Sequence, residues 1–370
     1  MTIAQRLPVS LTPLEAALDA VLRGLVPVAP LELPLAVALH SIAAEMPALH
    51  AQPQRDVAVS DGWAMCANDL VGASSYAPLP LGVPPVWVEA GGAMPDGTDC
   101  VVDADVVDTS GPIVQVLGEA IPGQGVRRAG SDVAEGRPVI DAGQPVRPRD
   151  LLLLRAAGLD RLNVRRPRLR VVNIPGGQVS AQFVAAAART AGAEIVCTEA
   201  AGRDAAAITA ALDPRACDLL IAIGGSGVGR TDAAVTALAG HGEVLAHGIA
   251  LQPGRTAAVG RIGTTPVVAL PGAPDQAFAA WCAIAIPVLD RLSGRRPRES
   301  LGLPLARKIA SSVGIAEIVL LVRQQDDWMP LAIGDLSLDA IARAEALLIV
   351  SSASEGFAAG TSVDAYMLRE

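Results

Sequence analysis

The 370-residue sequence predicts a multidomain α/β protein with β-rich sections, and three observations lead to this fold class. Apolar strand-like runs alternate with helical patterns from Leu169 to Gly294, which is typical of a parallel α/β sheet. Short strand-like runs separated by Gly- and Pro-rich turns fill the section from about Gln52 to Val139. A smaller β-rich section follows the polar break at Arg295–Arg298. A chain of this length typically divides its core between several domains.

Composition excludes several classes of protein. Hydrophobic residues make up 51% of the chain and charged residues 18%, which excludes a disordered or fibrous chain. A net charge of −9 argues against a nucleic-acid binder, which needs a basic surface. The five cysteines are dispersed and none forms a CxxC pair, so we expect reduced thiols and no zinc or disulfide framework. No signal core opens the chain, and the longest apolar run, Ala277–Leu289, is shorter than the ~20 residues of a membrane span. We therefore expect a cytoplasmic protein with no membrane or nucleic-acid partner.

The first helix is predicted over Leu11–Leu25, where apolar residues recur at helical spacing. Thr12 is the expected N-cap, Pro13 the first helical residue, and Glu15 completes a capping box. A shorter helical pattern covers Pro34–Ala44. Another, Arg149–Gly158, returns after the β section, so the first helices and this one are expected to close a small domain around it.

The alternating section resolves into four strands and four helices. The strands are expected at Leu169–Ile174, Glu194–Thr198, Leu219–Ile223 and Thr265–Leu270, and the helices at Val179–Ala191, Arg203–Leu212, Thr231–Ala239 and Ala277–Leu292. The terminal section predicts strands at Ile309–Val313, Glu317–Val322, Ala346–Ser351 and Ser362–Leu368, with a helix at Ser337–Ala344.

The most distinctive local feature is a glycine-rich loop from Ile221 to Asp232, which follows a buried strand and precedes a helix. Such a loop lets backbone N–H groups approach a phosphate, and ligands of open α/β sheets sit at the carboxyl ends of the strands. The same pattern also fits a tight strand–helix turn in which Asp232 favours the helix dipole. A dinucleotide fingerprint fits poorly because the order of the glycines differs.

Three further features could carry chemistry, and each also has an ordinary structural explanation. Pro-Gly turns lie at Gln252–Thr256 and Leu270–Pro274, where Arg255 is either a phosphate ligand or a solvated turn residue. The turn Asp61–Ala64 is common in a β domain. The segment Arg127–Asp132 is either an anion cradle or a solvated hairpin.

Taken together and in order, these segments resemble the molybdopterin molybdenumtransferase family, of the MoeA and gephyrin E-domain type. The corresponding motifs are DGxA at Asp61–Ala64, a GAxxPxGAD-like segment at Gly92–Asp99, RRxGxD at Arg127–Asp132, SGGxSxGxxD at Gly224–Asp232, KPGKP at Gln252–Thr256, LPGNP at Leu270–Pro274, and a terminal stretch at Ser337–Ala346. The resemblance covers nearly the whole chain.

The resemblance implies an elongated homodimer whose subunits have four domains. A helical N-terminal and linker domain would comprise residues 1–50 and 145–166, with an inserted β domain at residues 51–144. A molybdopterin-binding parallel α/β domain would cover residues 167–296, and a small C-terminal β domain residues 297–370. It also implies that the inserted domain of one subunit closes the cleft of the other. A molybdoenzyme client or a molybdopterin adenylyltransferase is the implied partner.

The implied reaction takes adenylated molybdopterin and molybdate as substrates, releases AMP and inserts molybdenum at the dithiolene, with Mg²⁺ assisting. By resemblance, the catalytic residues are Asp61, Asp132 and Asp232, of which Asp61 and Asp232 would hold the metal ion. The residues implied to bind the pterin or its phosphate are Arg127, Gly224, Gly225, Ser226, Gly227, Gly229, Arg255, Pro271, Gly272 and Pro274.

The sequence departs from the family pattern at several of these places. The acidic TGDEL segment is replaced by Asn173–Ser180, which carries no acidic pair. KPGKP has become Gln252–Thr256, with Arg255 as its one cation, and Ala273 replaces the asparagine of LPGNP. Where the family has Gly-Ser in the terminal domain, this chain has Gly334 and Asp335. A carboxylate there should weaken the capture of an oxyanion such as molybdate.

Two functional hypotheses follow. The first is an active molybdenumtransferase with an altered site, supported by the retained Asp61, Asp132, Asp232 and glycine loop. The second is a non-catalytic paralogue that binds molybdopterin or the finished cofactor and carries it to a client enzyme. A nucleotide-dependent sugar or cofactor enzyme on a similar α/β core is a third, which the order of the motifs disfavours.

Overall fold

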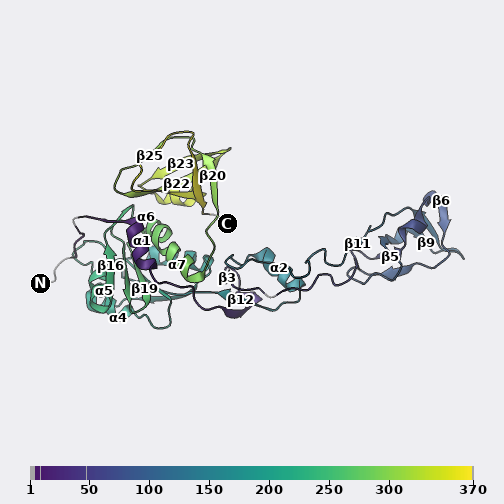
Figure 1. Ribbon diagram of the computed structural model, residues 1–370, viewed down its shortest axis with the longest axis horizontal. Coiled ribbons are helices and arrows are strands. Elements are labelled where there is room, and N and C mark those ends of the chain that lie inside the picture. The colour runs from purple at the N-terminus through teal and green to yellow at the C-terminus, as the bar shows by residue number, and fades with distance from the viewer. Residues whose placement is uncertain (1–4, 9, 47, 369–370) are drawn as a thin grey trace. The chain divides into compact units, whose positions relative to one another are not determined.

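The computed structural model describes residues 5–8, 10–46 and 48–368, and its contacts divide them into two compact units (Figure 1). The larger unit comprises the described residues of Met1–Ala44, Ala142–Val146 and Asn163–Glu370. The smaller unit comprises those of Glu45–Asp141 and Arg147–Leu162. Within the described residues, every helix is too short or too polar to cross a bilayer.

A six-stranded sheet forms the centre of the larger unit. Its strands run in the order β14 (Glu194–Glu199), β13 (Arg168–Asn173), β15 (Leu219–Ile223), β19 (Thr265–Leu270), β18 (Ala258–Ile262) and β16 (Glu243–His247). The first four are parallel, as expected, and β18 and β16 continue the sheet antiparallel. The predicted parallel sheet is therefore found, and the two antiparallel strands at its edge were not recognised in the sequence.

Helices cover both faces of this sheet, and alternating strand residues divide the core between the two faces. One face packs against α1 (Leu14–Leu22), α3 (Gln178–Thr190), α6 (Pro274–Ala280) and α7 (Ile286–Ser293), whereas α4 (Ala205–Ala211) and α5 (Ala234–His241) cover the other (Figure 1). Because α3 and α4 lie on opposite faces, the chain reverses direction between β13 and β15. Such a switch point is where open α/β sheets bind ligands.

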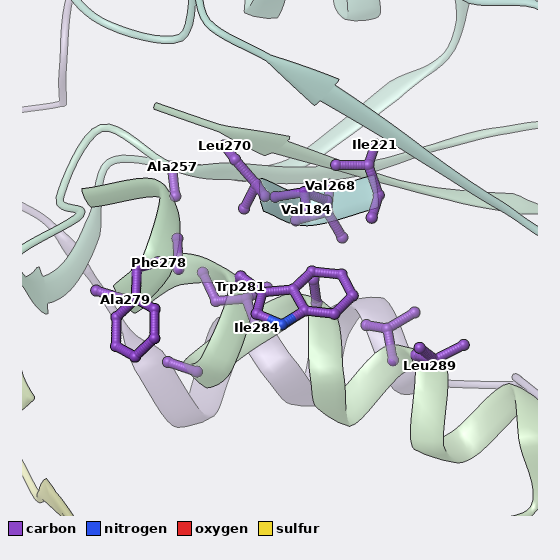
Figure 2. Close-up of a cluster of buried hydrophobic side chains, with 14 of the residues drawn as sticks. Val184, Ile221, Ala257, Val268, Leu270, Phe278, Ala279, Trp281, Ile284 and Leu289 are labelled. Atoms are coloured by element: carbon purple, nitrogen blue, oxygen red, sulfur yellow. The ribbon is translucent and has the colours of Figure 1, made fainter. Parts of the chain in front are cut away.

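The larger of the two cores contains Phe278 and Trp281, with Phe183 packed against it. Trp281 faces Val268 of the central strands (Figure 2), and the rings of Phe278 and Phe183 pack with centroids 5.7 Å apart. The predicted helix over Ala277–Leu292 is found, but α6 and α7 are joined by a π-helical turn, η4 (Trp281–Ala285). Pro287 lacks an N–H, and an irregular turn before it is a common way to accommodate a proline inside a helix.

A second, seven-stranded sheet joins the C-terminal section to the α/β section. It runs β1 (Thr12–Pro13), β17 (Ile249–Gln252), β22 (Ala316–Gln324), β24 (Ala346–Val350), β26 (Ser362–Met367) and β20 (Ser300–Pro304), and β23 (Asp327–Ile333) also pairs with β22. The helix α8 (Leu338–Arg343) and the pair β21 (Ile309–Ala310) and β25 (Gly356–Phe357) complete this section. Since β17 pairs directly with β22, the turn that follows β17 lies against the C-terminal section.

Two N-terminal predictions are wrong. Thr12 and Pro13 form strand β1, which pairs with β17, so Thr12 caps no helix and no capping box forms with Glu15. The helix begins only at Leu14. The stretch Pro34–Ala44 contains one 3₁₀ turn, η1 (Leu35–Val37), between β2 (Leu31–Pro34) and β3 (Ile42–Ala43). Both short strands pair with β12 (Arg161–Arg165), a partner that local periodicity cannot reveal.

The smaller unit is built of short strands, as its turn-rich sequence predicts. They are β4 (Val57–Ala58), β5 (Gly62–Met65), β6 (Ser74–Pro80), β7 (Val86–Val88), β8 (Cys100–Val102), β9 (Val107–Asp108), β10 (Gln115–Gly118) and β11 (Val126–Arg127), with the 3₁₀ turns η2 (Ala67–Leu70) and η3 (Ala104–Val106). The expected helix is found as α2 (Pro148–Ala156). Trp63 and Trp87 pack edge to face across β5 and β7, with ring centroids 5.1 Å apart.

Candidate functional site

A pocket with a cavity volume of about 360 Å³ opens at the carboxyl ends of the four parallel strands. Each strand contributes its following loop, so the pocket sits at the switch point between β13 and β15. Its lining residues are Gly176, Gly177, Arg203, Gly224, Gly225, Gly227, Asp232, Thr256, Pro271, Gly272, Ala273 and Gln276. Six of these twelve positions are glycines of three loops, so backbone rather than side chain forms much of the wall.

The glycine loop, Gly224 to Asp232, needs its glycines for conformation and for space. Gly224 and Gly225 have φ of +91° and +66°, in the left-handed region that favours glycine. A Cβ on Gly227 would lie 2.7 Å from Oδ2 of Asp232. The loop therefore follows a path that a chain with ordinary side chains could not take.

Two side chains hold the carbonyl groups of this loop from outside it. Gln5 donates from Nε2 to the carbonyl oxygen of Gly227 over 2.6 Å, and its Oε1 accepts from the N–H of Val235. His247 places Nε2 3.0 Å from the carbonyl oxygen of Ser226. A carbonyl only accepts, so His247 carries its proton on Nε2. Burial lowers the pKa of His247, which favours this neutral form.

These contacts determine where the loop's N–H groups point. In a trans peptide each N–H points opposite to the carbonyl that precedes it. The N–H groups of Gly227 and Val228 therefore point away from His247 and Gln5 respectively. Those of Gly225, Ser226, Gly227 and Val228 donate to no acceptor in the part of the chain that the structure describes. A run of free N–H groups beside a pocket is an arrangement that binds anions.

We expect Gln5→Leu to lower the free energy of unfolding by about 1–3 kcal/mol, because it leaves the partly buried carbonyl of Gly227 without a donor. It should also weaken the binding of a pterin phosphate. Denaturant unfolding and equilibrium binding measure the two effects. Gln324→Leu, at an exposed position of β22, is the matched control and should change neither.

One ion pair closes the side of the pocket. Arg203, from the loop after β14, donates from Nη2 to Oδ1 of Asp232 over 2.9 Å and from Nε to Oγ1 of Thr231 over 3.2 Å. Its Nη1 donates to the carbonyl of Pro175. Oδ2 of Asp232 accepts the N–H of Gly229 over 2.9 Å. Both oxygens of the one carboxylate that lines this pocket are thus engaged.

Not every predicted glycine-loop residue faces the pocket. The N–H of Gly229 donates to the carboxylate of Asp232. Ser226 is fully buried, and its Oγ has no hydrogen-bond partner among the described residues. Pro274 is the first residue of α6, whereas Pro271 and Gly272 do line the pocket. Arg203, Gln5 and His247 were missed in the sequence. Arg203 could have been found from its place just after a predicted strand, at the same edge of the sheet.

A second pocket, of about 250 Å³, lies beside the turn that contains Arg255. Its lining residues are Gln252, Pro253, Gly254, Arg255, Asp275, Gln276, Gly334 and Asp335. One cation therefore faces two carboxylates, and Gln252 donates to the carbonyl of Gly334 over 3.2 Å. Gln276 lines both pockets. Arg255 therefore belongs to this neighbouring pocket and not to the glycine-loop pocket.

The remaining predicted site residues lie in the smaller unit. Oδ1 of Asp61 accepts the N–H of Ala90 over 2.8 Å. The exposed Arg127 and Asp132 form an ion pair at 3.3 Å. Gly62 of the DGxA motif has a structural role, because a Cβ there would lie 2.3 Å from the carbonyl oxygen of Val102 on the paired strand β8.

Comparisons with known proteins agree with this architecture. A model of the MoeA N-terminal region (domain I and II) matches residues 12–158, and a model of a probable molybdopterin binding domain matches residues 170–291. The second contains all three glycine-bearing loops of the pocket. The fold and the site thus define a protein of the molybdopterin-binding class.

Sequence relatives and solved structures identify the family to which the chain belongs. Molybdopterin molybdenumtransferase 2 of Mycobacterium tuberculosis is 33% identical over 294 residues, which cover 68% of this chain and 70% of the relative. Molybdopterin molybdenumtransferase of Haemophilus influenzae is 25% identical over 274 residues, covering 66% and 68%. The crystal structure of the molybdopterin biosynthesis moeA protein from Pyrococcus horikoshii shares the fold, with a TM-score of 0.71 and 21% identity over 97% of this chain and all of that one. The chain belongs to the MoeA family of molybdopterin molybdenumtransferases.

Proposed function

We propose that this protein acts in molybdenum cofactor biosynthesis, as a molybdopterin molybdenumtransferase that takes adenylated molybdopterin and molybdate and releases AMP. The observation that carries the proposal is the run of free N–H groups in the glycine loop beside the 360 Å³ pocket. A pterin phosphate is an anion of the kind that such a loop binds. The names of the sequence relatives support the transferase over the carrier hypothesis.

Different residues of the pocket would bind the phosphate, contact the pterin and orient the attacking water. Gly224, Gly225 and Gly227 would bind the terminal phosphate through backbone, and Pro271 with Gly272 would shape the wall next to the pterin. Asp232 is the one carboxylate lining this pocket and would orient the water that attacks the phosphoanhydride. Breaking that bond releases AMP and leaves the dithiolene to receive molybdenum from molybdate.

The family resemblance also implies Mg²⁺ held by Asp61 and Asp232, but the surroundings of Asp232 do not fit a cation. Its Oδ1 is 2.9 Å from a guanidinium nitrogen and its Oδ2 accepts a backbone N–H. No group of three or more His, Cys, Asp or Glu side chains suited to a metal ion occurs among residues 5–8, 10–46 and 48–368. We therefore derive no catalytic step through a metal ion at Asp232.

The homodimer, the four-domain division and the partner proteins stay predictions of the resemblance. The roles of Asp61, Arg127 and Asp132 in the smaller unit have the same status, because nothing in their hydrogen bonds distinguishes a catalytic from a structural role.

The test of the proposed function is the release of AMP from adenylated molybdopterin by the purified protein, with and without molybdate. We expect release that molybdate stimulates. Tight binding of the adenylated pterin without any release would contradict the transferase and support the carrier.

The second pocket makes a separate prediction about molybdate. Asp335→Ser removes one of the two carboxylates facing Arg255 and should increase the affinity for molybdate roughly fivefold, since it removes a repulsion from a dianion. Asp326→Asn, at an exposed position of the β22–β23 turn, is the control and should change nothing. The apparent KM for molybdate in AMP release measures the effect, and an equal KM in Asp335→Ser and wild type would show that molybdate does not enter this pocket.

A further inference from the structure

We propose that Arg203 binds the terminal phosphate in the glycine-loop pocket and supplies there, from the protein itself, the positive charge that a metal ion would otherwise provide. The inference rests on the proposed function, since it names the group that holds the pterin phosphate. It assigns a binding residue that no motif of the sequence marked.

Three contacts hold the guanidinium of Arg203 at the pocket. It joins the loop after β13, through the carbonyl of Pro175, to the end of the glycine loop, through Thr231 and Asp232. Pro175 lies 28 positions before Arg203 in the sequence, and Asp232 lies 29 positions after it. The guanidinium is therefore fixed before a ligand arrives, which reduces the entropy lost on binding.

The fixed guanidinium still has donors to offer. An arginine carries five N–H groups, and the three contacts of Arg203 use one each on Nε, Nη1 and Nη2. One N–H on Nη1 and one on Nη2 remain for a ligand. The side chain is 37% exposed and lines the pocket with Gly225 and Gly227, so these donors lie beside the free backbone N–H groups.

The electrostatics of the pocket require a cation here. Asp232 is only 16% exposed, and a lone carboxylate in the pocket would repel a phosphate. Arg203 is the one charged partner of that carboxylate and the one cation among the pocket's lining residues. It offsets Asp232 and adds charge-assisted hydrogen bonds, which are the strong kind for phosphate.

The test compares two ligands, molybdopterin and its dephosphorylated form, in anaerobic equilibrium binding to the full-length protein. Wild type should bind molybdopterin more tightly than the dephosphorylated pterin. Arg203→Ala should lose roughly 10- to 100-fold affinity for molybdopterin and change little for the dephosphorylated form. Arg203→Lys should recover part of the loss, because it keeps the charge but not the planar fork.

A matched control and a metal titration complete the experiment. Arg189→Ala removes an exposed arginine in the last turn of α3, which does not line the pocket, and should leave both affinities unchanged. Wild-type affinity for molybdopterin should be the same with EDTA as with Mg²⁺. An affinity that EDTA abolishes would overturn the claim that Arg203 supplies the charge.

The outcomes separate the two proposals. If wild type binds neither pterin, the proposed function fails. If wild type discriminates between the two pterins and Arg203→Ala discriminates equally well, or loses both ligands equally, Arg203 does not bind the phosphate and this inference alone fails. Equal wild-type affinity for both pterins would also overturn it, since no phosphate would then be held.

Discussion

Asp232→Ala will reduce AMP release from adenylated molybdopterin by roughly 100-fold or more, the range expected when the group that orients the attacking water is lost. Asp232 is the only carboxylate lining the glycine-loop pocket. Its replacement also leaves the N–H of Gly229 and Nη2 of Arg203 without their acceptor. The rate constant at saturating substrate is the measurement, because the proposed role is in the chemical step.

The control for this variant is Asp339→Ala. Asp339 is an exposed carboxylate of α8 that pairs with Arg343 one helical turn later, and such surface pairs contribute about 0–1 kcal/mol. Its replacement should leave AMP release unchanged. A folded Asp232→Ala protein that turns over at the wild-type rate would remove Asp232 from the mechanism.

Gly227→Ala will weaken the binding of molybdopterin at least roughly tenfold, the effect of losing more than one hydrogen bond to a charged phosphate. The added Cβ would lie 2.7 Å from Oδ2 of Asp232, so either the carboxylate or the loop must shift. Such a shift moves the N–H groups that the phosphate needs. Equilibrium binding of molybdopterin measures the loss.

Gly240→Ala is the matched control for this glycine. Gly240 lies in α5, and a Cβ there meets nothing within 4 Å. Alanine is a better helix former, so this variant should be more stable by roughly 0.5–1 kcal/mol and bind molybdopterin normally. Normal binding by Gly227→Ala as well would mean that the phosphate does not rest on this loop.

The sequence predicts the central strands almost to the residue. Leu219–Ile223 and Thr265–Leu270 coincide with β15 and β19, because strands buried on both faces are apolar throughout and end at recognisable turns. The errors fall where a strand exists only through a distant partner. Thr12 and Pro13 read locally as a helix start, yet they pair with Ile249 and Ala250. The hydrogen-bonding edge that they complete is created by the fold, and no local pattern encodes it.

The candidate site was predictable to a similar degree and for similar reasons. Gly224, Gly225 and Gly227 are visible because glycines cluster in sequence where backbone must approach a ligand. Arg203 and Gln5 act on the same loop from 29 and 222 positions away, and a single arginine or glutamine in a polar stretch carries no signal. Their roles depend on which loops the sheet brings to one edge.

The charge of the two pockets was only partly predictable. Asp335 stood out against the family pattern, but Asp275, which lines the same pocket, did not. The missing acidic pair at Asn173–Ser180 was visible in the sequence, whereas the guanidinium of Arg203, which bonds to the carbonyl of Pro175 in that segment, was not. Relative to the family pattern, the chain thus lacks the acidic pair in the loop after β13, and the guanidinium of Arg203 is bonded to that loop.

The most direct test of the account is whether molybdenum becomes bound to the pterin. The purified full-length protein is incubated anaerobically with adenylated molybdopterin and molybdate, and the pterin is then isolated for elemental analysis alongside quantified AMP. The proposed function predicts one molybdenum and one AMP for each pterin converted. Pterin recovered with its adenylate intact and without molybdenum would contradict it, and would identify the protein as a binder of the pterin that does not carry out the transfer.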